Sequence, residues 1–399
     1  MRSRRRWAVL AVGVAAQTAA SAVVYGVPFL VPSLRDERGL SLAAVGIVVA
    51  APTLGLLVAL IAWGAVVDRV GERVPMALGL GVCGVLTTGL ALLAPRSLAV
   101  AVVLLVLAGI GAASVNAASG RLIMGWFGVE ERGVAMGIRQ TAQPLGVAVA
   151  GLVLPTLAQR EGSFVALGWP ALACAVCAVL VLLVAADPPR PSRAPGEAPP
   201  ASPYRSAVLP RVHAASALLV LPQFAISAFS LEYLVREQGW SPGTAGIFVA
   251  AAQIAGAAGR IGSGWWSDRV GSRLRPMRLL AGASAAVLLV FSLGDLTVGL
   301  IAVAAIAAGS VITVADNGLA FTATAEIAGS AWSGRALGVQ NTTQNLVATA
   351  APPVLGALIG ASSYALGFAV AAIAPLAAIA VTPVRDEPVP GRVAARERS

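Results

Sequence analysis

Stretches of apolar residues, each near the length that crosses a bilayer, recur along the whole chain with short polar segments between them. A membrane-spanning helix needs about twenty consecutive, mainly apolar residues. The pattern therefore predicts twelve transmembrane helices, at 7–34, 42–66, 74–94, 98–124, 133–158, 164–186, 207–235, 242–266, 276–293, 296–326, 335–360 and 363–383.

The composition agrees with a lipid environment. The chain has 399 residues, of which 58% are hydrophobic and 12% are charged, with a mean hydropathy of +0.84. A soluble domain carries roughly a quarter charged residues. Because so few charged side chains cannot cover a water-soluble body of this size, we expect an all-α integral membrane protein.

A proline-rich stretch from Asp187 to Pro210 separates the sixth predicted helix from the seventh. Dense proline removes backbone donors and keeps a chain extended. We therefore expect a six-helix bundle at 1–186, a cytoplasmic linker at 187–206, a second six-helix bundle at 207–384 and a cytoplasmic tail at 385–399.

The positive charge follows the loops between the apolar stretches. The net charge is +10, and all 28 basic residues are arginine. Alternate loops differ about fourfold in arginine content, as the positive-inside rule requires. This distribution favours a multi-pass protein of the inner (plasma) membrane with both termini in the cytoplasm, and it argues against a nucleic-acid-binding groove.

The chain repeats itself after a shift of 200 residues. Gly64–Arg73 and Gly264–Arg273 both read Gly-x-x-x-Asp-Arg-Val-Gly-x-Arg. A shift of 201 residues relates Asn116 to Asn317. Two parallel six-helix halves with matching polar positions are typical of secondary transporters, whose binding site lies between the repeats.

The Gly64–Arg73 segment joins the second predicted helix to the third. We expect Gly64 to permit close helix contact, Gly71 to permit a tight turn, and Asp68 to accept hydrogen bonds from a helix end or an arginine. Such a loop can hold the cytoplasmic face closed. A basic loop that only sets topology is the alternative interpretation.

This segment, its second copy and the twelve-span plan together resemble the major facilitator superfamily (MFS), in its prokaryotic type, over about 7–383 of the chain. The resemblance implies two pseudo-symmetric six-helix bundles. It also implies secondary active transport of a small organic solute by alternating access, with proton coupling left open, by a protein that works as a monomer in the lipid bilayer.

The resemblance further implies a cytoplasmic charge cluster in each half. Asp68 would act with Arg121, Glu131 and Arg132, and Asp268 with Glu326 and Arg335. The predicted gate comprises these residues and the motif positions Gly64, Arg69, Gly71, Arg73, Gly264, Arg269, Gly271 and Arg273.

Two departures from the family pattern bear on mechanism. Leu105 stands four residues before Gly109-Ile110-Gly111, where proton-coupled members often have arginine. The fifth predicted helix lacks the Gly-Pro-x-x-Gly-Gly element of drug antiporters. An efflux antiporter for drugs or metabolites remains the alternative function, and a non-transporting membrane sensor is the alternative from a different class.

Polar side chains within the predicted spans are the candidates for contact with a substrate or a coupling ion, because such groups are costly in lipid. Arg139 could bind an anionic solute and Asp316 could carry a proton, or the two could form a structural pair. Glu232 is expected near the outer interface and solvated, and His213 without a special role. The candidates are Gln17, Tyr25, Asn116, Arg139, Gln143, Gln223, Asp316, Asn317, Gln340 and Gln344.

Other chemistries lack their residues. With no lysine anywhere in the chain, a phosphate-binding loop of the ATP-driven kind cannot be built. One histidine and scattered carboxylates predict neither an enzyme nor a metal site, and Cys174-x-x-Cys177 lies in an apolar stretch. We expect no cofactor, no nucleic acid, and as partners a small-molecule substrate, with a proton left open.

Overall fold

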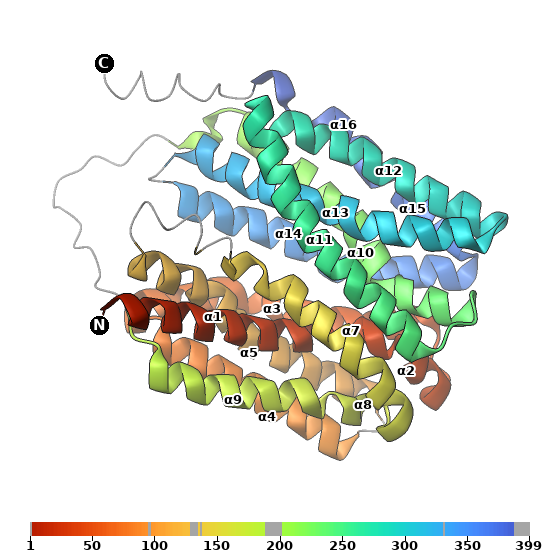
Figure 1. Ribbon diagram of the computed structural model, residues 1–399, viewed down its shortest axis with the longest axis horizontal. Coiled ribbons are helices and arrows are strands. Elements are labelled where there is room, and N and C mark those ends of the chain that lie inside the picture. The colour runs from red at the N-terminus through yellow and green to blue at the C-terminus, as the bar shows by residue number, and fades with distance from the viewer. Residues whose placement is uncertain are drawn as a thin grey trace. The chain divides into compact units, whose positions relative to one another are not determined.

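Every regular element in the described part of the computed structural model is a helix (Figure 1). The structure describes residues 2–94, 97–127, 135, 138–187, 202–329 and 332–386, except the side chains of 2–4, 68, 124, 333 and 334. Two compact units result. Unit 1 contains Met1–Ala194 and Leu231–Gln253, and unit 2 contains Pro195–Ser230 and Ile254–Ser399.

Twelve helices in the described residues are long and apolar enough to cross a membrane, which confirms the predicted twelve-span, all-α membrane fold. The first six spans are built from α1 (Arg2–Val24) with η1 (Val27–Leu30) and α2 (Val31–Arg38), α3 (Leu42–Val70), α4 (Arg73–Leu93), α5 (Leu98–Trp126), α7 (Ala142–Glu161), and α8 (Ser163–Ala166) with α9 (Gly168–Val184). The others are α10 (Val208–Arg236), α11 (Pro242–Val270), α12 (Leu274–Leu296), α13 (Gly299–Ala328), α14 (Ser333–Ala361), and α15 (Tyr364–Ala371) with α16 (Ile373–Val381).

The domain boundaries at 186 and 207 stay a prediction. The grouping into units assigns Leu231–Gln253, the end of α10 and the start of α11, to unit 1. Most of the predicted linker, 188–201, and most of the predicted tail, 387–399, lie outside the described residues.

Three spans are interrupted, and each interruption lies four residues before a proline. A proline has no N–H to donate to the carbonyl four residues earlier. Helix α1 ends at Val24, four residues before Pro28, and α8 ends at Ala166, four residues before Pro170. Helix α15 likewise ends at Ala371, four residues before Pro375. Other prolines, such as Pro52 in α3 and Pro155 in α7, lie inside unbroken helices, so a proline permits a break in a span but does not by itself impose one.

Glycine sets the closest helix contacts in unit 1. A Cβ atom added at Gly55 would overlap the carbonyl oxygen of Val106, and one at Gly109 would overlap that of Pro52. Helices α3 and α5 thus touch backbone to backbone at two matching glycines. The same close approach recurs between α4 and α5, where a Cβ atom at Gly79 would overlap the Ser114 hydroxyl.

Unit 2 has its own apolar core along α10, α12 and α13, centred on Leu219, Met277, Ala281 and Leu319. Stacked rings of Phe291 and Phe368, with centroids 3.9 Å apart, join α12 to α15. In both units large aliphatic side chains also point outward. Leu92 and Leu300, for example, are 80% and 74% exposed, as expected for surfaces that face lipid tails.

Candidate functional site

The loop between α3 and α4 is held by a carboxylate that the sequence analysis did not single out. Asp187, just after α9, accepts hydrogen bonds through Oδ1 from the backbone N–H groups of Glu72 (2.7 Å) and Arg73 (2.8 Å). These N–H groups lie at the N-terminus of α4, where they have no partner within the helix. Asp187 therefore caps α4 from the segment that follows α9.

Gly71 is required at this loop for two reasons. Its φ is +104°, a conformation that other residues rarely adopt. A Cβ atom there would also collide with the Asp187 carboxylate. The tight turn that the sequence analysis expected at Gly71 thus also makes room for the cap.

Further bonds connect this loop, α9 and α5. The Arg73 guanidinium donates to the carbonyl oxygen of Leu182 in α9. Trp126 Nε1 of α5 donates to the carbonyl oxygen of Ala186, just after α9, at 2.7 Å. Glu72, which is buried, forms an ion pair with Arg121 at 3.5 Å. Within unit 1, Arg121 therefore acts on this loop through Glu72.

The structure describes only some of the predicted gate in unit 1. Glu131 and Arg132, and the side chain of Asp68, lie outside the described residues. Arg69 is exposed at the end of α3. No described atom lies within 4 Å of a Cβ atom built on Gly64. In this structure the close helix contact expected at Gly64 is absent among the described residues, and Gly55 and Gly109 make such a contact instead.

We expect Asp187→Ala to lower the stability of the protein by about 1–2 kcal/mol, the usual cost of losing a helix cap. The apparent melting temperature in detergent measures this loss. Asp187→Asn is the matched control, because it keeps an oxygen acceptor and should lose less. Equal melting temperatures for Asp187→Ala and the parent would contradict the role of this cap.

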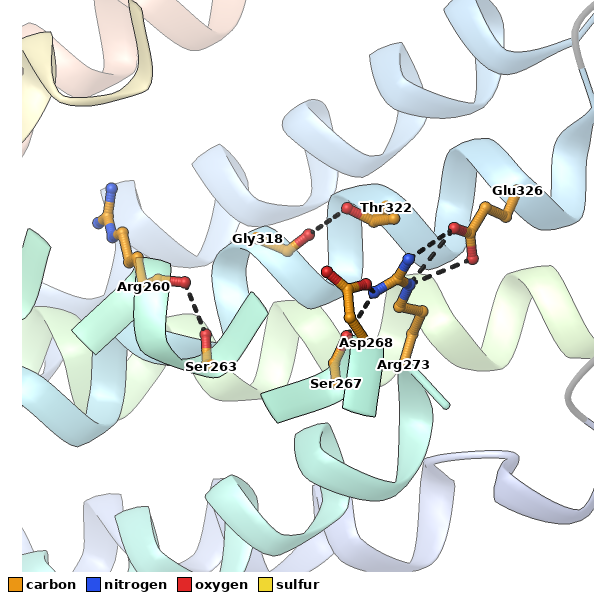
Figure 2. A network of polar contacts seen from close by, with 8 residues as sticks. All are labelled: Arg260, Ser263, Ser267, Asp268, Arg273, Gly318, Thr322 and Glu326. Carbon is orange, nitrogen blue, oxygen red and sulfur yellow. Dashed lines mark hydrogen bonds and ion pairs between the residues drawn. The ribbon is translucent and has the colours of Figure 1, made fainter. Parts of the chain in front are cut away.

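The second motif copy, in unit 2, is centred on Arg273 (Figure 2). Its guanidinium forms ion pairs with Asp268 and, at 3.2 Å, with Glu326 of α13, and it donates to Ser267 Oγ at 2.5 Å. Burial disfavours the charged form, but the bonds to the two carboxylates outweigh this and raise the pKa of Arg273. Arg273 thus joins α11 to α13.

The remaining predicted gate residues of unit 2 lie beside this cluster or near it. Arg269 stacks over the Trp265 ring, 3.7 Å from its centroid, and Arg335 lies 4.9 Å from the centroid of Trp332. Gly271 has a φ of +64°. As at Gly64, no described atom lies within 4 Å of a Cβ atom on Gly264, so this position makes no close helix contact in the described chain.

A chain of hydrogen bonds links four polar residues of unit 1. Arg139 Nε donates to Ser119 Oγ (3.0 Å), Ser119 donates to Gln17 Oε1 (3.4 Å), and Gln17 Nε2 donates to Asn116 Oδ1 (3.2 Å). Gln17 also contacts Ser21 Oγ at 3.4 Å. Three of the predicted candidates, from three spans, are therefore brought together, with Ser119 as the connecting residue that sequence reasoning missed.

Arg139 has only neutral partners among the described residues. Its second bond goes to Gln140 Oε1 at 2.8 Å, and no described carboxylate lies within ion-pair distance. The side chain is half-buried, near the start of the described part of this span, Ile138–Glu161. In the repeat, Arg139 corresponds to Gln340, so only the first half carries the charge.

Unit 2 holds a second polar cluster made of neutral groups. Asn317 Nδ2 donates to Gln223 Oε1 at 2.9 Å, and Gln344 Nε2 donates to Asn317 Oδ1 at 3.3 Å and to Ser216 Oγ at 2.7 Å. In both units an asparagine of the fourth helix of its half thus bonds a glutamine of the first. Sequence reasoning missed Ser216, as it missed Ser119.

The histidine for which no role was expected is buried in unit 2. His213 Nδ1 lies 2.5 Å from Oε1 of the fully buried Gln340, and His213 Nε2 lies 3.2 Å from the Tyr204 hydroxyl. Tyr204 precedes α10, and burial raises the pKa of its phenol. Gln340 therefore belongs to a separate cluster from Gln344 and Asn317.

Asp316 is buried in α13, with 2% of its surface exposed, and its Oδ2 has no hydrogen-bond partner among the described residues. Arg260 of α11 is the charged side chain that acts on it. Ser263, also of α11, donates to the carbonyl oxygen of Ala315, the residue before Asp316, at 2.6 Å. Figure 2 shows Arg260 and Ser263 on α11. An ionised carboxylate in this position is costly.

The last two candidates are half-buried. Tyr25 follows α1 and packs against the apolar core of unit 1, and Gln143 lies in the first turn of α7. The expectation that Glu232 is solvated is wrong, because none of its surface is exposed. Arg35 of α2 and Arg236 of α10 form ion pairs with it. The place of Glu232 near the end of its predicted span did not reveal these two neighbours.

Comparisons with known proteins agree with this architecture. The sequence profile described as Major Facilitator Superfamily matches residues 12–352. An uncharacterized MFS-type transporter of Mycobacterium tuberculosis is 46% identical over 99% of this chain and 88% of its own length. A probable L-galactonate transporter of Escherichia coli is 27% identical over 34% of this chain and 32% of its own length.

Two solved structures have the same fold. A bacterial homologue of the human lysosomal transporter Spinster, in an inward-facing and occupied conformation, superposes with a TM-score of 0.79 at 16% identity, over 96% of this chain and 98% of that one. A D-xylose–proton symporter gives a TM-score of 0.77 at 13% identity, with the same coverage. The chain is a multi-pass membrane protein that belongs to the Major Facilitator Superfamily of transporters.

Proposed function

We propose that this protein is a secondary transporter that moves a small organic anion by alternating access, with Arg139 as the residue that binds the negative charge. The single observation that carries the proposal is the charge of Arg139 among neutral partners, Ser119 and Gln140. A permanently charged guanidinium in a membrane span needs a counter-charge. A carboxylate on the solute would supply it during transport.

The neighbouring groups suit a hydroxylated acid. Gln17 and Asn116 are joined to Arg139 through Ser119, and their amides can donate and accept hydrogen bonds. Arginine binds carboxylates with two parallel N–H donors. The relative from E. coli is named a probable L-galactonate transporter, and galactonate is a polyhydroxy carboxylate.

The placement in the membrane is part of the same proposal. The arginine asymmetry supports an inner (plasma) membrane protein with cytoplasmic termini. The motif clusters around Asp187 and around Arg273 would then lie at the cytoplasmic ends of their units, where they would stabilise one of two alternating conformations.

Replacing Arg139 by glutamine should weaken binding of an organic acid by roughly tenfold to a hundredfold, because one charge-assisted bond contributes about 1.5–3 kcal/mol. Binding is measured on purified protein by thermal shift and by calorimetry, with a panel of small carboxylates that includes L-galactonate. The neutral sugar D-xylose is the comparison ligand.

Arg160→Gln is the matched control, since Arg160 is an exposed arginine at the other end of the same span. It should bind the acids like the parent, and Arg139→Lys should retain part of the affinity. The proposal fails if Arg139→Gln binds the same acid as tightly as the parent, or if only D-xylose binds.

A further inference from the structure

Unit 1 contains a second charged cluster, which includes no residue of either motif copy. Arg35 and Asp36 come from the end of α2, and Glu232 and Arg236 come from the end of α10. We call these four residues the α2–α10 cluster. Two cations and two anions balance its charge.

Glu232 lies at the centre of this cluster. Its Oε1 is paired with Arg35 and, at 3.5 Å, with Arg236 Nε. Its Oε2 is buried and has no hydrogen-bond partner among the described residues. Buried carboxylates need partners for both oxygens, so this second oxygen is the atom of the cluster that can take up a proton.

Arg236 also connects α10 to two further residues of α2. Its Nη2 donates to the Asp36 carboxylate and to the Pro32 carbonyl oxygen, the latter at 3.2 Å. Asp36 is exposed, with 63% of its side chain in solvent, whereas Glu232 is fully enclosed. Of the two carboxylates, only Glu232 would leave charge uncompensated inside the protein on gaining a proton.

The other charged groups near α2 and α10 either have partners outside the α2–α10 cluster or are exposed. Glu37 accepts bonds from the backbone N–H and hydroxyl of Ser163, both at 2.9 Å. Arg38 lies over the Phe164 ring. Arg160 and Glu161 are exposed at the end of α7. Residues 242–253 of α11 carry no charge. Glu232 therefore responds to Arg35, Arg236 and Asp36.

A close contact of glycines holds the same segment on unit 1. A Cβ atom at Gly246 would overlap the Gly151 carbonyl oxygen, and one at Gly243 would lie 3.3 Å from Thr156 Oγ1. Helix α11 thus touches α7 through small residues. Leu231–Gln253, which belongs to the second sequence repeat, is attached to unit 1 by this contact and by the α2–α10 cluster.

We infer that Glu232 is a proton-binding site, and that adding a proton to its carboxylate releases Leu231–Gln253 from α2 and α7, the helices of unit 1 that it contacts. This inference rests on the alternating-access part of the proposed function. It is independent of which solute is carried and of Arg139.

The physical reason is the loss of charge balance. A proton from water bonds to Oε2 and makes Glu232 neutral, so Arg35 and Arg236 retain only Asp36 as a counter-charge. Two guanidinium groups that are each about two-thirds buried are poorly stabilised beside a neutral acid, and removing one charge of a partly buried ion pair is unfavourable. Separation of α10 from α2 lets water solvate both arginines.

A disulfide test measures whether the segment is attached. Cys83, Cys174 and Cys177, which are all buried, are first replaced by alanine. Thr156→Cys and Gly243→Cys are then introduced, because a Cβ atom at position 243 lies 3.3 Å from Thr156 Oγ1 in the attached state. The yield of this disulfide under a mild oxidant, in native membranes without solute, reports attachment.

Glu232→Gln removes the negative charge, as protonation does, so its disulfide yield should fall several-fold below the parent's at alkaline pH. Glu237→Gln is the matched control, because Glu237 is an exposed carboxylate on the same segment. Its yield should equal the parent's. As the pH falls, the parent's disulfide yield should drop toward that of Glu232→Gln. The pH profile of Glu232→Gln itself corrects for the effect of pH on thiol oxidation.

A Glu232→Gln yield equal to the parent's at every pH would overturn the inference. If Glu232→Gln fails to insert, the double variant Arg35→Gln/Glu232→Gln replaces it, because it removes both charges of one ion pair. The disulfide yield of the double variant should change with pH only as much as thiol chemistry requires. The two proposals fail separately. Arg139→Gln with parental acid binding refutes the proposed solute class but leaves the disulfide result standing, and the reverse pattern refutes only the role of Glu232.

Discussion

Replacing Gly109 by alanine should destabilise the protein severely, although the change adds a single methyl group. The new Cβ atom would overlap the Pro52 carbonyl oxygen, at the place where α3 and α5 touch backbone to backbone. Neither backbone can move without separating two packed helices. Overpacking of this kind costs typically about 1–3 kcal/mol and occasionally more. The yield of folded protein and its apparent melting temperature measure the effect.

Gly81→Ala is the matched control for this prediction. Gly81 lies within α4, and no described atom lies within 4 Å of its added Cβ atom. In an open helical position alanine is preferred to glycine by about 1 kcal/mol. The same substitution should therefore stabilise at 81 and destabilise at 109. Two variants with the same melting temperature would refute the close contact of α3 with α5.

Replacing Asp316 by asparagine should have the opposite sign and raise the stability of the protein. Asparagine has nearly the same shape but needs no counter-charge, and the Oδ2 of Asp316 has no partner among the described residues. An unsatisfied buried polar group costs roughly 1–3 kcal/mol, and more when it is charged. The gain in melting temperature should grow as the pH rises, because the parent must then bury a negative charge.

Asp386→Asn is the control for Asp316. The Asp386 carboxylate is 54% exposed and pairs with Arg211 at 3.2 Å, so its loss should change stability by at most about 1 kcal/mol. If Asp316 also carries the coupling proton, Asp316→Asn should flatten the pH dependence of solute uptake into proteoliposomes. A lower melting temperature for Asp316→Asn at every pH would show that its carboxylate is well paired.

The sequence could predict the spans because the requirement of the bilayer is local. About twenty apolar residues are needed wherever a helix crosses, and every such stretch is visible without knowing its neighbours. The breaks after Val24, Ala166 and Ala371 were not predicted, since Pro52 and Pro155 lie inside helices that stay unbroken. The spans themselves depend on one segment at a time.

The partners of the polar residues could not be predicted in the same way. Asp187 was assigned to the start of a linker, and only the fold brings it to the N-terminus of α4. Glu232 was expected in solvent because it lies near the end of its span, yet Arg35 and Arg236 enclose it. Gly64 and Gly109 look alike in sequence, and only the position of α3 against α5 distinguishes them.

The breaks in the last span of each repeat show how the two halves have diverged. Helices α8 and α9 part before Pro170, and α15 and α16 part before Pro375, a shift of 205 residues. In the same span Ala166-Leu167-Gly168 recurs as Ala365-Leu366-Gly367, a shift of 199 residues, so Pro170 falls opposite Ala369 and not opposite Pro375. Both halves thus have an interrupted last span, but the interrupting prolines stand at different repeat positions. Arg139 and Gln340 show a similar divergence, because they hold one repeat position and only the first half carries a charge there.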